Sequence, residues 1–398
     1  MNHIPLKAIA AVAAIVCLAA ATAHAQTLEW LIQEGPDDEY LYGRGVASDG
    51  LGHVYVSGSI SFSGGGDDAM LFKYDSDGDL EWSQRYDAVG RFNTLRGLAP
   101  DHLDNVYAAG SGRFGSPDDL TQNAHIVKFD ESGALLWDRQ LGEDNLTERF
   151  FSVAVDNAGN AYAGGRTDDQ EGDALLAKYS ADGQLEWTRQ WGTSAREAWG
   201  GMATDASGAV FAAGYTNGSL AGENAGSQDA FVTKLDADGT LIWTRQFGTT
   251  ETDRARGVAY DGSGGVFVVG QTAGLLGETS SGDTDAFVTR LDADGAVLWT
   301  RQFGSAAVDV AWGVAADEFG NVFVAGNTDG DLDGPNAGEA DAFLTMFTGA
   351  GELLWTRQLG SHAFDRSQSV STDGLGNVYA AGYTLGALTE SRNPGKAD

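Results

Sequence analysis

Short segments in which apolar and polar residues alternate recur along this chain, and turns rich in Asp and Gly separate them. Alternation with a period of two, in segments enriched in β-branched and aromatic residues, predicts β-strands. In one clear copy these segments cover residues 199–205, 209–214, 230–235 and 240–247. The turns at residues 205–208 and 236–239 are short enough to form hairpins. Each unit is therefore predicted to be an antiparallel meander of four strands, called a, b, c and d in chain order.

This unit is repeated along the chain. A tryptophan in strand d marks each copy, at Trp30, Trp82, Trp137, Trp187, Trp243, Trp299 and Trp355. A pattern Val-Tyr/Phe-Val/Ala-x-Gly in strand b ends at Gly58, Gly110, Gly165, Gly214, Gly270, Gly326 and Gly382. A sheet that is apolar on both faces must pack against further copies, and such sheets arranged radially close into a ring. The sequence thus predicts an all-β fold, a seven-bladed β-propeller of four-stranded antiparallel blades.

The predicted propeller is a single domain over residues 26–398. Its blades cover about residues 45–86, 95–141, 150–191, 199–247, 255–303, 311–359 and 367–398, the last completed by residues 27–33. The segment Thr27–Trp30 begins as a strand d with no strand a, b or c before it, so we expect it to pair into the last, incomplete blade and close the ring. The sixth unit continues beyond Asp341 into strand c, whereas the last unit ends at the matching Asp398. The sequence therefore predicts a C-terminal truncation of a longer reading frame.

Residues 1–25 have the pattern of a secretory signal peptide. Lys7 precedes an apolar stretch over residues 8–21, and Ala23-His24-Ala25 forms an A-x-A cleavage site. The protein is therefore expected in the periplasm, on the cell surface or outside the cell. The rest of the chain has no apolar run long enough to cross a bilayer, so no transmembrane segment is expected in the mature chain.

The chain carries 57 acidic and 24 basic side chains, a formal net charge of −33. This balance excludes nucleic acid as a partner unless a local basic patch exists, and the sequence contains no run of Lys or Arg. The surplus of carboxylates favours a soluble, acidic protein, which we expect to be monomeric.

Two copies show a resemblance to a known repeat family. Residues 229–270 and 285–326 carry D-A-F-V-T-K/R-L-D-A-D-G, then W-T-R-Q-F-G, and end in the strand b pattern. This sequence closely resembles the bacterial SBBP β-propeller repeat. The resemblance implies an exported or surface-associated propeller and no agreed catalytic activity, so no catalytic residue is carried over. The stretch K-L-D-A-D-G-x-L-x-W is also similar to pyrroloquinoline quinone propeller repeats, whose cofactor-site residues are not found here.

Residues that recur in every copy are predicted to serve the blade, because an active site is needed only once. The strand d tryptophans are expected to wedge between blades. An Asp ends every strand a, at Asp49, Asp101, Asp156, Asp205, Asp261, Asp317 and Asp373, and is expected to lock the following turn through backbone N–H groups. The strand d arginines, such as Arg245, are expected to pair with an Asp such as Asp229.

No catalytic or metal-binding residue is predicted. Carboxylates gather in the c–d turns, for example at Asp236 and Asp238, but the spacing lacks the EF-hand Gly and Glu, so hairpin chemistry is favoured and Ca²⁺ is the less favoured alternative. His53, His102, His125 and His362 form no H-x-H or H-E-x-x-H pattern. No other cofactor is expected.

Recognition is expected on one rim of the propeller. The b–c and d–a connections lie on the same rim of a meander, and the b–c segments at residues 59–67, 111–122, 215–228, 271–284 and 327–340 are long and divergent. Side chains on or near the d–a links are the candidate binding residues: Trp199, Trp312, Arg196, Arg254, Arg256 and Asp309. The two tryptophans are candidate anchors for a protein or glycan ligand, and the alternative is that both only pack between blades.

Three functional classes remain open after these observations. A non-catalytic binding, adhesion or scaffold module at the bacterial cell surface is favoured. A structural envelope protein is the first alternative, and a quinoprotein-like enzyme is the second.

Overall fold

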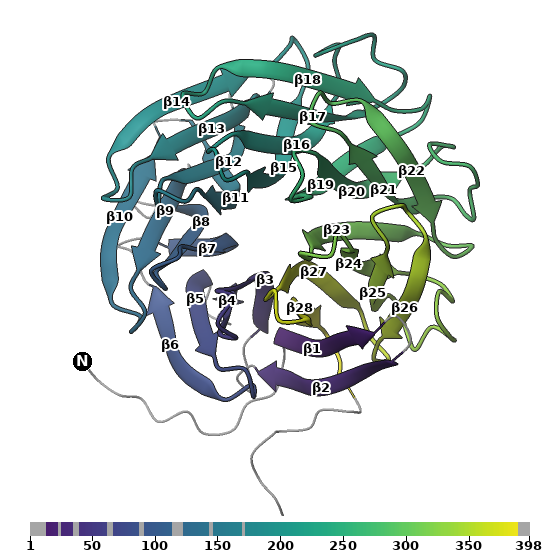
Figure 1. Ribbon diagram of the computed structural model, residues 1–398, viewed down its shortest axis with the longest axis horizontal. Helices are drawn as coiled ribbons and strands as arrows, with labels where there is room; N and C mark the ends of the chain where they lie inside the picture. Colours follow the sequence, from purple (N-terminus) through teal and green to yellow (C-terminus); the bar gives the residue numbers. More distant parts are fainter. Residues whose placement is uncertain are drawn as a thin grey trace, which may run out of the picture.

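A computed structural model describes residues 13–22, 25–34, 40–61, 67–86, 91–113, 122–142, 146–168 and 172–388. In these residues the regular structure consists of β-strands, which form four-stranded antiparallel sheets arranged around a central opening (Figure 1). The predicted all-β propeller of four-stranded blades is confirmed. The predicted truncation after Asp398 lies outside the described residues.

Six blades are each built from four strands that are consecutive in the chain. The first three consist of β3 (Tyr40–Ser48), β4 (Val54–Ser61), β5 (Asp67–Tyr74) and β6 (Leu80–Tyr86); β7 (Arg91–Pro100), β8 (Val106–Arg113), β9 (Asn123–Phe129) and β10 (Leu135–Leu141); and β11 (Glu148–Val155), β12 (Ala161–Thr167), β13 (Ala174–Tyr179) and β14 (Leu185–Trp191). The next three consist of β15 (Glu197–Thr204), β16 (Val210–Thr216), β17 (Asp229–Leu235) and β18 (Leu241–Phe247); β19 (Asp253–Tyr260), β20 (Val266–Thr272), β21 (Asp285–Leu291) and β22 (Val297–Phe303); and β23 (Asp309–Ala316), β24 (Val322–Thr328), β25 (Asp341–Phe347) and β26 (Leu353–Leu359).

The remaining sheet is composite, and here the expectation of seven blades needs correction. It has the order β2-β1-β28-β27, in which β27 (Asp365–Thr372) and β28 (Asn377–Thr384) are joined by β1 (Ala13–Thr22) and β2 (Ala25–Glu34). The predicted N-terminal strand does lie in this sheet as β2, but it reaches β28 only through β1, which pairs with both. The chain thus builds six contiguous blades, and a sheet made from its two ends completes the ring.

Gln33 of β2 makes the hydrogen bonds that the equivalent glutamine of strand d makes elsewhere. Gln33 donates to Gly386 O at 3.2 Å and accepts from Leu388 N at 3.2 Å. Gln246 makes the equivalent contacts with Gly218 O at 3.0 Å and Leu220 N at 2.8 Å. The inner strand β27 also contacts β3, so the ring of inner strands is closed.

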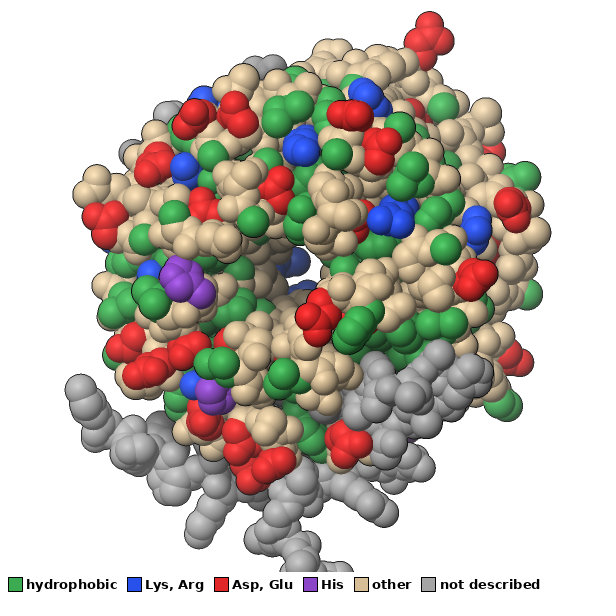
Figure 2. All heavy atoms as spheres, in the orientation of Figure 1, with side chains coloured by type: hydrophobic (Ala, Val, Ile, Leu, Met, Phe, Trp, Pro, Cys, Tyr) green, Lys and Arg blue, Asp and Glu red, His purple; other side chains and the backbone are tan. Residues whose placement is uncertain are grey.

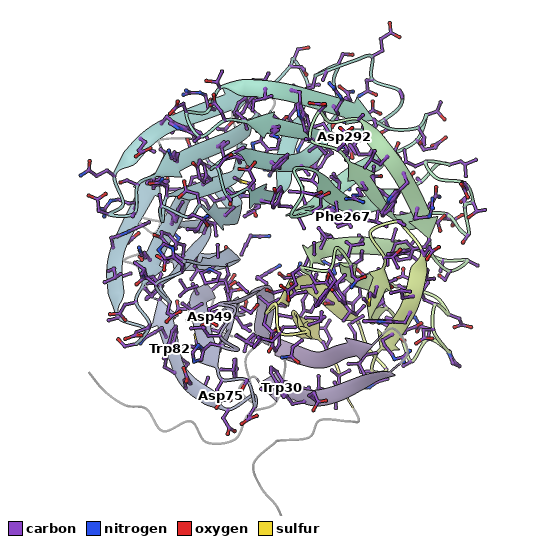
Figure 3. All side chains as sticks on the ribbon, in the orientation of Figure 1. Trp30, Asp49, Asp75, Trp82, Phe267 and Asp292 are labelled. Atoms are coloured by element: carbon purple, nitrogen blue, oxygen red, sulfur yellow. The ribbon has the colours of Figure 1, made fainter. Side chains whose placement is uncertain are left out.

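Neighbouring blades are held by the strand d tryptophans. The indole N–H of Trp30 donates to Ser76 O at 3.1 Å, in the c–d turn of the next sheet, and Figure 3 shows Trp30 beside the turn that carries Asp75. Trp82 makes the same contact with Glu131 O at 2.9 Å. The turn that contacts Trp30 contains Gly78, which has a positive φ of 84°. Gly78 packs on the Trp30 indole so closely that a Cβ would clash with it. The turn glycine is therefore part of the contact between blades.

The core lies between the blades. Strands b and c are buried along most of their length, whereas the outer strands d are largely exposed on one face. Each main cluster joins adjacent sheets: Phe211 and Trp243 of one blade pack with Val266 and Phe287 of the next. This arrangement follows from sheets that are apolar on both faces.

The Asp at the end of strand a closes the a–b turn. Asp205 Oδ1 accepts from Ser207 N at 2.9 Å and Ala209 N at 3.0 Å. Equivalent bonds to the second and fourth following backbone N–H groups occur at Asp49, Asp101, Asp156, Asp261, Asp317 and Asp373. This is the geometry of a turn lock.

The expected pairing of Arg245 with Asp229 is wrong. A β-bulge shifts the register between Lys234 and Leu235, so Arg245 lies opposite Val232. Its guanidinium donates to Gly295 O at 3.1 Å and Asp294 O at 2.9 Å in the next blade. Gln246 takes the expected place instead and donates to Asp229 Oδ2 at 2.9 Å.

Candidate functional site

Every inner strand contains a β-bulge, and the bulges direct one residue per sheet toward the axis. In β19, for example, Ala255 pairs with Gly270 and Gly257 with Val269, which leaves Arg256 as the extra residue. The seven extra residues are Arg44, Arg96, Phe151, Gly200, Arg256, Trp312 and Gln368, and we call them the bulge ring. Bulges re-aim side chains and are frequent beside functional sites.

The repeated glycine of strand b makes room for the bulge. A Cβ on Gly270 would collide with the backbone carbonyl of Arg254, and a Cβ on Gly382 would collide with that of Arg366. The same contact applies to the other copies of this glycine. The strand b glycine, which recurs in every copy, therefore makes possible the bulge position, whose residue differs among the copies.

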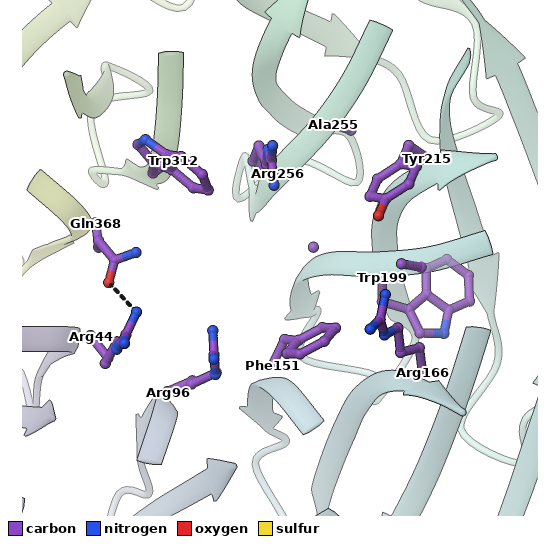
Figure 4. Close-up of a pocket in the computed structure, with 12 residues that line it drawn as sticks. Arg44, Arg96, Phe151, Arg166, Trp199, Tyr215, Ala255, Arg256, Trp312 and Gln368 are labelled. Atoms are coloured by element: carbon purple, nitrogen blue, oxygen red, sulfur yellow. Dashed lines mark hydrogen bonds between the residues drawn. The ribbon is translucent and has the colours of Figure 1, made fainter. Parts of the chain in front are cut away.

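The whole bulge ring lines a pocket of about 250 Å³ in the centre of the propeller (Figure 4). Its wall is completed by Arg166, Ala198, Trp199, Tyr215 and Ala255. Figure 2 shows the central opening, with Lys or Arg atoms deep inside it. Residues far apart in the sequence thus meet at one cavity.

Arg44, Arg96 and Arg256 of the bulge ring line this cavity. Arg366 does not line it but lies beside it, on the Trp312 ring. We call Arg96, Arg44, Arg366 and Arg256 the arginine arc. Among the described residues, none of the four forms a salt bridge. Their Nε atoms are buried and lack a hydrogen-bond partner. Within the described residues, Arg44 Nη1 donates to Gln368 Oε1 at 3.5 Å and Arg256 Nη2 donates to Gln271 Oε1 at 3.1 Å. Most of their N–H donors therefore have no acceptor among the residues that the structure describes.

Aromatic rings support the arc in place of carboxylates. The guanidinium carbons of Arg256 and Arg366 lie 4.4 Å and 4.3 Å from the ring centroid of Trp312. Arg96 lies over Phe151 at 5.5 Å. The Trp312 indole N–H donates to Asn327 Oδ1 at 2.8 Å, which fixes the ring. Cation–π contacts hold a guanidinium without consuming its N–H donors.

The electrostatics of the arc show that its members affect one another. Burial, followed by repulsion from Arg44 and Arg149, lowers the pKa of Arg96 to about 10. Burial, with repulsion from Arg254 and Arg366, lowers the pKa of Arg256 to about 10. The pKa values of Arg44 and Arg366 are also lowered, mainly by burial. The arc is therefore a cluster of buried positive charge without a salt bridge in the described part of the chain.

Two of the predicted binding residues, Trp312 and Arg256, belong to the bulge ring and line the pocket. Arg254 does not line it but lies over the ring of Tyr215, a wall residue, at 5.3 Å and contacts Gln228 of the b–c loop. The b–c and d–a segments also meet as predicted, since Gln228 bridges to Thr252 in parallel.

The other three predicted residues have different surroundings. Trp199 is only 2% exposed and packs on Phe231 with a centroid distance of 4.8 Å, so it forms part of the wall mainly as a core residue packed between blades. Asp309 is fully buried, and its Oδ2 accepts from Ser305 N at 2.7 Å and Oγ at 3.0 Å, which makes it a loop lock and not a surface residue. Arg196 is exposed and does not line the pocket.

Sequence reasoning missed Arg44, Arg96 and Arg366. A signal was available for the first two, because each bulge residue precedes a small residue that recurs in all copies, such as Gly45 and Gly97. The described part of the chain holds no group of three or more His, Cys, Asp or Glu residues placed to bind a metal. No helix in that part is long and apolar enough to cross a membrane. Two of the predicted variable loops are described only in part, since residues 62–66 and 114–121 lie outside the described ranges.

Comparison with known proteins agrees with the architecture. The protein FlaEY of Caulobacter vibrioides, a regulatory protein, is 29% identical over 166 residues, which cover 37% of this chain and 17% of that protein. The chain thus spans a small part of this curated relative. The β-propeller domain of the Trilobed protease from Pyrococcus furiosus, described as an open velcro topology, has a TM-score of 0.50 at 7% identity, over 87% of this chain and 90% of that one. A europium-containing methanol dehydrogenase has a TM-score of 0.49 at 11% identity, over 92% and 79%.

The likeness to the propeller of the Trilobed protease concerns the fold alone. Residues 242–277, 298–333 and 354–388 match the family SBBP, a beta-propeller repeat, which confirms the resemblance for these segments. The chain is a β-propeller repeat protein that carries SBBP repeats in its C-terminal half.

Proposed function

We propose that this protein is an exported, non-catalytic propeller that binds a protein or glycan partner through the channel mouth and the b–c and d–a loops around it. One observation carries the proposal. The bulge ring holds Arg, Phe, Gly, Trp and Gln at equivalent positions, whereas the flanking Gly, Asp and Trp positions repeat. A purely structural position would be served by one residue type in every blade. The bulge residues differ from blade to blade and line a cavity, which supports binding of a ligand by variable side chains on a rigid scaffold.

The proposal includes a ring of seven sectors, closed by the strand that carries Trp30. The contacts of Trp30 with Ser76 and of Gln33 with Gly386 support it, because they reproduce those of strand d in the other blades. Export by the predicted signal would remove β1 from the closing sheet, since cleavage after Ala25 separates β1 from β2. N-terminal sequencing of protein recovered from the periplasm and medium tests this part. A first residue of Gln26 is expected, and intact Met1 in all exported protein would contradict it.

The binding proposal is tested with the purified full chain on a panel of neutral and acidic glycans and isolated surface proteins. The channel double variant R256Q/W312A is compared with R357Q, because Arg357 lies on outer strand β26 with a 51% exposed side chain. We expect at least one ligand whose affinity falls about tenfold or more in the double variant and stays unchanged in R357Q. Ligands that bind both variants as well as they bind the native chain would contradict the channel mouth as the site.

A further inference from the structure

We propose that the arginine arc binds a small, multivalent oxyanion, a molecule with two or more carboxylate, sulfate or phosphate groups, inside the central channel. The inference rests on the proposed function and adds the chemical class of the ligand that enters the channel.

The first argument is charge placement. The protein has a net charge of −33, yet the four arginines of the arc form no salt bridge among the described residues. Burying cations without counterions is unfavourable unless something compensates them. A protein with 57 acidic side chains could have supplied a carboxylate for each arginine. The negative charges of Asp67 and Asp329 raise the pKa values of Arg44 and Arg366, respectively, but neither carboxylate forms a salt bridge with its arginine.

The second argument is the orientation of the donors. Trp312 holds two guanidiniums at 4.4 Å and 4.3 Å through ring contacts, and Phe151 holds Arg96 in a similar way. A guanidinium held on a ring keeps its N–H edge available, and that edge matches the oxygens of a carboxylate, sulfate or phosphate. Gln368 adds an amide from the same ring of bulges. The site is therefore preorganised for oxyanions before any ligand arrives.

The third argument is size and valency. The three arginines of the arc that line the pocket come from three different sheets, Arg96 from β7, Arg44 from β3 and Arg256 from β19. A ligand with several oxyanion groups can therefore contact more of them at once than a ligand with one group. The cavity of about 250 Å³ suits a small molecule. The acidic surface repels a long polyanion at a distance, whereas a small anion needs to pass only the mouth. These observations favour a small polyanion over an acidic polymer.

The alternative is that the arginines only hold the blades together. The two roles differ in their effect on stability. Because each arginine is buried beside like charges, R96Q and R256Q should raise Tm by about 2 °C or more, whereas removal of a structural arginine lowers it. A fall of Tm in both variants would contradict the proposal.

Ligand binding is measured on the full chain by calorimetry and by Tm shift, with citrate, pyrophosphate and sulfate as probes and sodium chloride at equal ionic strength as reference. We expect saturable binding of at least one probe, weakened about tenfold or more by R96Q or R256Q and unchanged by R357Q. The three probes distinguish carboxylate, phosphate and sulfate chemistry. R357Q also controls for the general stabilisation that sulfate gives to proteins.

Failure of this inference can be separated from failure of the proposed function. If no probe binds saturably, or if binding is the same in R96Q, R256Q and R357Q, the arc is not an anion site. In that case the proposed binding function is still supported if R256Q/W312A has a lower affinity than the native chain for a neutral glycan or a protein ligand. If the channel variants change the binding of no ligand of any kind, the proposed function fails as well.

Discussion

The indole N–H of Trp243 donates a hydrogen bond to the backbone carbonyl of Ala293 at 3.0 Å, across the boundary between two blades. The same indole packs against Gly295, and its exposed fraction is 9%. One side chain thus combines apolar burial with a specific polar contact, and the repeat places an equivalent tryptophan in every sheet.

Replacing Trp243 by Ala should lower the free energy of unfolding by about 3–5 kcal/mol, because a large buried side chain is lost and a cavity remains. W243F keeps much of the packing and loses the hydrogen bond, so its cost should be clearly smaller. Chemical denaturation measures both values. Leu241→Ala, at a side chain 49% exposed on the same strand, serves as the control and should change stability little.

Asp261 should stabilise the fold at neutral pH and lose this effect in acid. Burial raises its pKa, but hydrogen bonds from Arg290, Ser263 and Gly265 outweigh burial and leave the pKa lowered. Arg290 Nη2 lies 2.8 Å from Asp261 Oδ2. A lowered pKa in the folded state means that the stabilisation is present above the unfolded value near 3.8 and is lost as pH falls.

D261N should therefore cost about 1–3 kcal/mol at pH 7, with the difference from the native chain shrinking toward pH 3. Equilibrium unfolding at both pH values measures this. Asp205→Asn is the matched control, because Asp205 makes the same turn bonds and no recorded bond to an arginine. An equal, pH-independent cost in both variants would show that the Arg290 contact contributes nothing.

Asp309 should behave in the opposite way. Burial raises its pKa, hydrogen bonds from Thr328 and Ser305 lower it, and the nearby Asp285 raises it, with a net increase. A raised folded-state pKa means that this group's stabilising contribution is complete below the unfolded value and is lost as pH rises through the folded value. D309N keeps an acceptor for Ser305 N and removes the charge.

We expect D309N to be at least as stable as the native chain at pH 7, with this advantage disappearing near pH 4. D309A leaves Ser305 N without its acceptor and should cost about 1–3 kcal/mol at both pH values. Thermal unfolding of the two variants across this range is the measurement. A D309N variant that is as unstable as D309A at pH 7 would contradict the assignment of a charge penalty.

Gly270 should tolerate no side chain. A Cβ there collides with the carbonyl of Arg254, where the bulge that presents Arg256 begins. G270A should lower stability by about 1–3 kcal/mol through overpacking, and it should weaken citrate binding if the channel binds anions. Gly222, where a Cβ meets nothing within 4 Å, provides the control substitution G222A.

The fold was predictable because the alternating strand pattern, the Asp/Gly turns and the strand d Trp recur in each copy of the repeat. The bulges were not predicted. One extra residue leaves the alternation of apolar and polar residues in the strand almost intact and changes only which residues pair with the neighbouring strand. That omission explains the wrong partner for Arg245 and the missed Arg44 and Arg96. The burial of Asp309 could have been foreseen, since an acidic residue starts strand a in five units, at Glu148, Glu197, Asp253, Asp309 and Asp365.

The closing sheet could be predicted only in part. Trp30 identified an outer strand at the N-terminus, because the residues before it in the sequence resemble those before the other strand d tryptophans. The apolar segment now seen as β1 has the composition of a signal peptide, and composition alone does not distinguish that use from a strand between β28 and β2.

Gly200 is the bulge residue that carries no side chain, and a Cβ at this position would clash with the backbone of Arg256 in the next blade. The backbone of the propeller is nearly rotationally symmetric, but its chemistry is not. Arg44 and Arg96 come from two adjacent sheets, whereas Phe151, Trp199 and Tyr215 line the wall around Gly200. A channel built by copying one unit therefore has a wall whose side chains differ from sector to sector, so a molecule on the axis would meet different groups in different directions.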